Sequence, residues 1–125
     1  MSSTKQTVVV LGASDKPQRF SNKAIKKLQQ YGHIVIPVHP RLKEIESVTV
    51  AASLNDVPAN TVDTLTLYVG PERSIGLADA IVALHPKRVI FNPGTESELL
   101  QRKLSEHQIE WVEACTLVML DTDVF

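Results

Sequence analysis

The feature that most constrains this chain is an apolar run that stops at a glycine and leads into an amphipathic helix. Residues 5–11 form a run rich in β-branched apolar residues that ends at Gly12, a pattern typical of a central strand buried on both faces. Residues 22–31 carry apolar side chains at helical spacing, and Gly32 suits the position that follows a helix. A strand, a glycine turn and a helix in this order predict a parallel βα unit.

The rest of the chain repeats this alternation. Residues 33–38 predict a second strand, although Pro37 lies inside it and weakens its assignment as a central strand. The segment 41–58 has no clear pattern, and it is as compatible with a short helix as with irregular structure. Further strands are predicted at 62–69, 88–92 and 109–114, and a final apolar stretch lies at 117–120. Helices are predicted at 71–84 and 95–107, and a capping box from Thr95 to Glu98 begins the second of them.

Five strands that alternate with helices predict one α/β domain over residues 1–125. Because crossovers between parallel strands are right-handed, we expect a doubly wound, Rossmann-like parallel sheet with helices on both faces. The expected strand order is 3-2-1-4-5, numbered along the chain. In such sheets a ligand lies beyond the carboxyl ends of the strands, beside the first strand.

The composition excludes several classes of partner and site. A balance of 13 lysines and arginines against 14 aspartates and glutamates gives a net charge of −1, so no broad basic face for nucleic acid or a membrane is expected. No apolar run reaches the roughly 18 residues of a membrane span, and residues 1–7 are a polar lead-in unlike a signal peptide. The single Cys115 and four histidines without ligand spacing predict no metal site. We expect a cytoplasmic protein, with a protein partner or a homo-oligomer left open.

The first glycine turn predicts a phosphate site. The backbone amides of residues 12–14 open the way to the next helix, and Arg19 can add a charge-assisted contact. The turn departs from the dinucleotide fingerprint G-x-G-x-x-G, because Ser14 and Pro17 stand where its second and third glycines would be. His39 ends the second strand, where that fingerprint has an acid for the ribose. The sequence therefore disfavours an ordinary NAD site.

Two other strand ends carry candidate residues. Asn92, Pro93 and Gly94 put an amide and a glycine turn after the fourth strand, where they either approach a ligand or form a left-handed turn before a helix. Cys115 follows the fifth strand, and a nucleophilic role for it would need a base such as His39. A lone cysteine at a strand end is more often a small buried residue, so no catalytic group is predicted.

The order of these motifs resembles the small stand-alone CoA-binding domain proteins. Those proteins are similar to the N-terminal CoA-binding domain of succinyl-CoA synthetase α-subunits and of ADP-forming acyl-CoA synthetases. The resemblance covers roughly residues 7–120. The matching motifs are Gly12-Ala13-Ser14, Arg19-Phe20, Val38-His39-Pro40 where the family usually has V-N-P, Val69-Gly70-Pro71, Asn92-Pro93-Gly94 and Cys115.

The resemblance implies that coenzyme A or an acyl-CoA binds in the cleft, with its phosphates at the first turn and its adenine and pantetheine along the strand ends. The synthetases carry their phosphorylated histidine on a following domain, so the resemblance implies a non-catalytic binding role for one domain alone, and we expect that role to be regulatory. Two alternatives from other classes stay open. One is an NAD(P)-binding oxidoreductase or redox sensor, and the other is a structural interaction domain with a vestigial nucleotide cleft.

Overall fold

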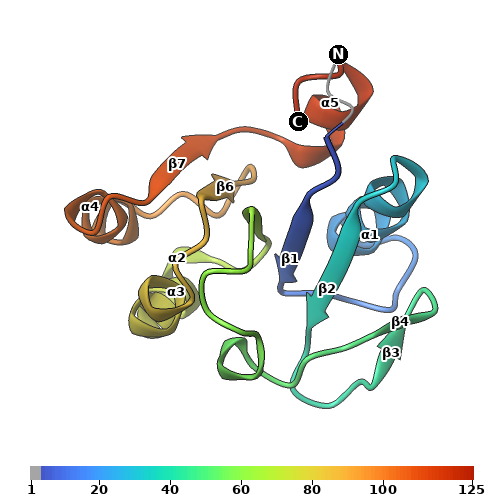
Figure 1. The fold of residues 1–125 in the computed structure, drawn as a ribbon, viewed down its shortest axis with the longest axis horizontal. Coiled ribbons are helices and arrows are strands. Elements are labelled where there is room, and N and C mark those ends of the chain that lie inside the picture. Colours follow the sequence, from blue (N-terminus) through green and yellow to red (C-terminus); the bar gives the residue numbers. More distant parts are fainter. Residues whose placement is uncertain (1–3) are drawn as a thin grey trace.

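The computed structural model describes residues 4–125 as a five-stranded parallel sheet between two layers of helices (Figure 1). The predicted α/β, doubly wound class is confirmed. Residues 1–3, the start of the predicted polar lead-in, lie outside the described residues. The sheet has the order β2-β1-β5-β6-β7 and consists of β1 (Thr7–Leu11), β2 (Ile34–Val38), β5 (Thr64–Leu67), β6 (Arg88–Phe91) and β7 (Glu110–Glu113).

The helices cover the sheet in two pairs, because α1 packs with α5 and α3 packs with α4. Within residues 4–125, no helix has the length and apolar character that a bilayer span requires. The helical elements are α1 (Phe20–Gln30), the 3₁₀ turn η1 (Leu54–Asp56), α2 (Pro71–Ser74), the 3₁₀ turn η2 (Ile75–Leu77), α3 (Ala78–Leu84), α4 (Glu98–Glu106) and α5 (Thr116–Asp121).

The side chains of β1 show why this strand lies inside the sheet. Val8 and Val10 pack into the core cluster that contains α1 and α5, whereas Val9 and Leu11 pack into the cluster that contains α3 and α4. Successive side chains of a strand point to opposite faces, so a continuous apolar run fills both layers at once. The carboxyl end of β1, and the glycine turn after it, therefore lie between the ends of β2 and β5.

The observed strand order corrects the predicted 3-2-1-4-5. Numbered along the chain it is 2-1-3-4-5, because β5 pairs with β1 while β2 lies at the edge. All four residues of β5 are buried, which suits a central strand, whereas Pro37 in β2 has no N–H for a second ladder. An isolated bridge between Val38 and Ala51 partly covers the outer side of β2. The point where the chain reverses direction across the sheet thus lies between β1 and β5.

The segment 41–58 contains a small hairpin, whereas its sequence is equally compatible with a short helix and with irregular structure. The hairpin is formed by β3 (Glu44–Ile45) and β4 (Val48–Thr49), which pair antiparallel, and η1 follows. Glu46 and Ser47 make the tip with φ angles of 51° and 66°. Both values lie in the left-handed region of tight two-residue hairpin turns. Ile45 anchors the hairpin, since it is almost completely buried.

Two predicted helices differ in detail from the structure. The helix expected over 71–84 is interrupted by η2, which contains Gly76. The helical spacing predicts that Ile75 faces the core, but Ile75 is partly exposed. The capping box expected at Thr95 is wrong. Ser97 is the N-cap of α4 and its Oγ accepts from the N–H of Leu100, while the Thr95 hydroxyl donates to the carbonyl of Asn92.

The stability of this fold is expected to fall as the pH drops below about 6.5, the ordinary pKa of histidine. The Nδ1 of His33 accepts a hydrogen bond from the N–H of Gln6, and burial followed by the charge of Arg88 lowers the pKa of His33. His33 therefore binds a proton more tightly in the unfolded chain than in the folded one. The stability that the neutral imidazole contributes is lost as the pH falls through the pKa of His33 in the folded protein. Urea unfolding between pH 8 and 5 measures the decline. We expect His33→Phe to flatten it and the exposed His107→Gln to leave it unchanged.

Candidate functional site

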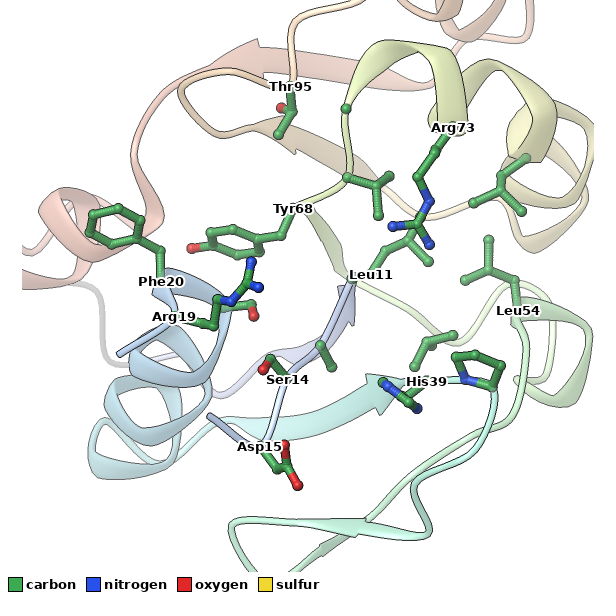
Figure 2. Close-up of a pocket in the computed structure, with 18 of the residues that line it drawn as sticks. Leu11, Ser14, Asp15, Arg19, Phe20, His39, Leu54, Tyr68, Arg73 and Thr95 are labelled. Atoms are coloured by element: carbon green, nitrogen blue, oxygen red, sulfur yellow. The ribbon is translucent and has the colours of Figure 1, made fainter. Parts of the chain in front are cut away.

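A cleft of about 820 Å³ lies across the carboxyl ends of β2, β1, β5 and β6 (Figure 2). This is the edge where the sequence predicted a ligand. The cleft brings together most of the predicted site residues, from segments far apart in the chain. They are Gly12, Ala13, Ser14, Arg19, Phe20, Val38, His39, Pro40, Val69, Gly70, Pro93 and Gly94.

The turn after β1 can be built only with a glycine. Gly12 has a φ of +91°, in the left-handed region that other residues rarely adopt. A Cβ at this position would lie 2.9 Å from Cγ1 of Val69 and 3.0 Å from the backbone carbonyl of Tyr68. The chain that follows β1 therefore passes directly against the end of β5, at the reversal point of the sheet.

The first turn of α1 faces the cleft with its N–H groups free. Arg19 is the N-cap residue and makes no side-chain cap, and the helical ladder begins where the N–H of Lys23 bonds the carbonyl of Arg19. Asn22 is fully buried and its Nδ2 donates to the carbonyl of Ser14, which ties the loop to the helix. Because uncapped N–H groups and the helix dipole both favour negative charge, this end of α1 suits a phosphate.

Four cationic side chains line the cleft, although the whole chain has a net charge of −1. They are Lys16, Arg19, Arg41 and Arg73, against the carboxylate of Asp15. None of the ion pairs found among residues 4–125 involves these four cations. In Figure 2, Arg19 and Arg73 extend toward the space from different elements. The cleft is therefore a local positive region whose charge is not neutralised by the described residues.

The imidazole of His39 is fixed by its own loop. Its Nδ1 accepts hydrogen bonds from the N–H groups of Arg41 and Leu42, both at 3.0 Å. An Nδ1 that accepts carries no proton, so the neutral ring has its proton on Nε2. His39 thus brings a hydrogen-bond donor to the end of β2, where the dinucleotide fingerprint requires an acceptor.

Tyr68 forms part of the cleft wall directly after β5. Burial raises the pKa of Tyr68 to about 12, against the smaller opposing influence of the Thr116 and Thr66 hydroxyls. Its phenol therefore stays neutral at physiological pH and adds no negative charge beside the four cations.

A smaller apolar slot of about 160 Å³ adjoins the cleft. Two predicted site residues, Asn92 and Cys115, line this slot and not the cleft, and Pro71 lines neither of them. The Nδ2 of Asn92 donates to the Oγ1 of Thr66 and to the carbonyl of Leu67. Its Oδ1 accepts from the N–H of Thr116. The Asn92 amide is thus occupied within the protein.

No metal centre is assembled at these strand ends. Among residues 4–125 there is no group of three or more His, Cys, Asp or Glu side chains placed to hold a metal ion. The donors that the cleft does offer, which are N–H groups and cationic side chains, are suited to an anion.

Comparison with known families agrees with this geometry. A family model described as a CoA binding domain matches residues 6–121. The chain belongs to this family of CoA-binding domains. The match includes the turn after β1, every strand of the sheet and all of α5, so the whole cleft of this CoA-binding domain lies within it.

Similar folds occur both in a chain of matching length and as one part of a longer enzyme chain. A crystal structure of an uncharacterized protein superposes with a TM-score of 0.89 at 40% identity, covering 98% of this chain and 99% of that one. An acetyl-coenzyme A synthetase from Candidatus Korarchaeum cryptofilum shares the fold, with a TM-score of 0.73 and 21% identity over 89% of this chain and 26% of the synthetase chain. The uncharacterized protein YneT of Bacillus subtilis is 31% identical over 72 residues, 58% of this chain and about half (53%) of its own length.

Several residues of the cleft were missed by the sequence prediction. Arg41 follows the predicted His39-Pro40 motif directly, and Arg73 lies in the first turn of α2, so a cation next to a predicted site motif is the signal that could have found them. Ser53 and Leu54 gave no signal, because they reach the cleft through the hairpin segment whose structure the sequence left undefined.

Proposed function

We propose that this CoA-binding domain binds coenzyme A in the cleft, with the CoA diphosphate at the turn after β1 and the first turn of α1. The observation that carries the proposal is the set of four unpaired cations, defined above, around an uncapped helix N-terminus. Phosphate groups are the ligands that this combination of N–H groups, arginine forks and positive charge favours.

The donors at the end of β2 favour a ligand with a phosphate on its ribose. CoA carries a 3′-phosphate there, whereas NAD has free hydroxyls that need an acceptor. The Nε2–H of His39 and the guanidinium of Arg41 both donate, and both belong to the cleft wall. NADP also has a ribose phosphate, so the family membership supports CoA over NADP.

We further propose that the role is non-catalytic, regulatory and cytoplasmic, with CoA occupancy read by a protein partner or by a second copy of the chain. The non-catalytic part is supported by the site itself, because Cys115 lines the slot whereas His39, the base it would need, lines the cleft. The proposal predicts that incubation with acetyl-CoA releases no free thiol above the uncatalysed rate. Thiol release that depends on protein concentration would contradict it.

The function is tested by isothermal titration of the protein with CoA, 3′-dephospho-CoA, NAD and NADP. We expect CoA to bind most tightly and dephospho-CoA more weakly, because the latter lacks the phosphate that His39 and Arg41 would meet. Preference for NADP or NAD would support the oxidoreductase or redox-sensor alternative. No heat and no thermal shift at millimolar CoA would reject CoA binding and leave the structural interaction domain.

Replacing Arg19 with alanine is expected to weaken CoA binding by about 1.5–3 kcal/mol, or roughly ten- to 150-fold in Kd. The reason is the loss of a charge-assisted hydrogen bond to phosphate. Titration calorimetry measures the change, and Arg102→Ala on α4 is the matched control, since Arg102 pairs with Glu98 outside the cleft. Equal affinity of the Arg19→Ala protein and the control would remove Arg19 from the site.

A further inference from the structure

We propose that the apolar slot beside the cleft binds the acyl chain of a short, uncharged acyl-CoA, so that the protein distinguishes acyl-CoA from free CoA. The inference rests on the proposed function, because the phosphates of the ligand must first be held in the cleft. It adds the class of acyl group, which CoA binding alone does not determine.

The slot shares part of its wall with the cleft. It is lined by Phe20, Tyr68, Asn92, Pro93, Cys115 and Leu117, and the first, second and fourth of these also line the cleft. A ligand held at the first turn of α1 therefore passes these shared residues on its way into the slot. The volume of the slot, about 160 Å³, exceeds the ~10–15 Å³ that one water molecule needs, so the slot has space for a chain of several carbons.

The walls of the slot offer no charge to an occupant. Phe20, Pro93 and Leu117 contribute apolar surface, and the phenol of Tyr68 is neutral. The amide of Asn92 is the strongest polar group in the wall, but its donors and its acceptor are already bonded to other parts of the protein. An acyl chain that ends in a carboxylate would lose its hydration here without gaining a partner, so a dicarboxylic acyl group is excluded.

The position of Phe20 indicates that the rim of the slot is completed by a ligand. Phe20 is the first residue of α1, yet its side chain is 67% exposed, while the next residue, Ser21, is buried. Figure 2 shows the Phe20 ring beyond Tyr68, away from the centre of the cleft. The Nζ of Lys23 lies over this ring, 5.3 Å from its centroid, and the rest of the exposed ring gains contact area when a chain enters beside it.

The test compares CoA, acetyl-CoA, butyryl-CoA and succinyl-CoA by titration calorimetry. We expect the affinity to rise from CoA through acetyl-CoA to butyryl-CoA, by up to about fourfold for each buried methylene. Succinyl-CoA has as many acyl carbons as butyryl-CoA but ends in a carboxylate, so we expect it to bind no more tightly than CoA. If CoA binds and butyryl-CoA is not preferred, or succinyl-CoA equals butyryl-CoA, the slot proposal is overturned. If CoA itself does not bind, the proposed function has failed.

Variants of α5 connect the preference to the slot. Leu117→Trp fills the slot and is expected to abolish the preference for butyryl-CoA while the affinity for free CoA is kept. Val118→Trp is the matched control, because Val118 is 57% exposed and lies outside the slot lining. Leu117→Ala enlarges the slot and is expected to move the preference from butyryl-CoA toward hexanoyl-CoA. An unchanged acyl series in both Leu117 variants would contradict the proposal.

Discussion

Gly12→Ala is expected to destabilise the protein by about 2–5 kcal/mol and to remove measurable CoA binding. The φ of +91° strains any residue with a side chain, and the new Cβ would meet Val69 at 2.9 Å and the Tyr68 carbonyl at 3.0 Å. Relief of this overlap must separate the turn after β1 from the end of β5, where we propose that the phosphate binds. Urea unfolding gives the stability change as a shift of the midpoint, and calorimetry gives the loss of binding.

Gly32→Ala separates the two causes of this effect. Gly32 has a φ of +83°, close to that of Gly12, but no atom lies within 4 Å of its Cβ position, and it follows α1 at the end remote from the cleft. We expect this variant to show the backbone strain alone, with a smaller loss of stability and unchanged CoA affinity. If both glycine variants cost the same stability, the close approach between the turn and β5 is not what requires Gly12.

The fold class could be predicted because each strand and helix carries its own hydrophobic period. The run in β1 fills both faces of the sheet, and the spacing in α1 provides one buried side. The strand order could not be read in this way, since the connection from β2 to β5 contains only a small hairpin and η1, and a segment of this length can reach the outer side of β2 or the free side of β1. Two signals for it were nevertheless present, because Pro37 suits an edge and the alternating threonines and leucines of β5, which carry no charge, suit the interior.

The candidate site was predictable where it depends on strand ends and less so where it depends on side-chain direction. Gly12, Arg19 and His39 line the cleft because they follow β1 and β2 closely. Asn92 also follows a strand, but its amide turns inward to bonds that no local pattern encodes. Leu54 reaches the cleft from a segment whose hairpin is held by tertiary contacts, so its position could not follow from sequence spacing.

Asn92→Leu is expected to cost about 3–5 kcal/mol of stability, because it removes the centre of a buried polar network. Asn92 is 2% exposed, and its amide bonds Thr66, Leu67 and the N–H of Thr116, while the Thr66 and Thr116 hydroxyls bond each other at 2.8 Å. A leucine of similar volume would leave the Thr116 N–H and the Leu67 carbonyl without this partner in a dry interior. Urea unfolding measures the loss, and a change below 1 kcal/mol would show that these bonds are replaced.

The control for this substitution is Asn55→Leu, at an exposed position of η1, which is expected to change stability by less than about 0.5 kcal/mol. The comparison also assigns a role to Asn92. Its Oδ1 holds the first residue of α5, the helix that brings Leu117 to the slot. At a temperature where the Asn92→Leu protein is still folded, we therefore expect the preference for butyryl-CoA to weaken more than the affinity for CoA, since the four cations of the cleft come from other elements. An equal loss for both ligands would instead indicate that Asn92 supports the cleft as a whole.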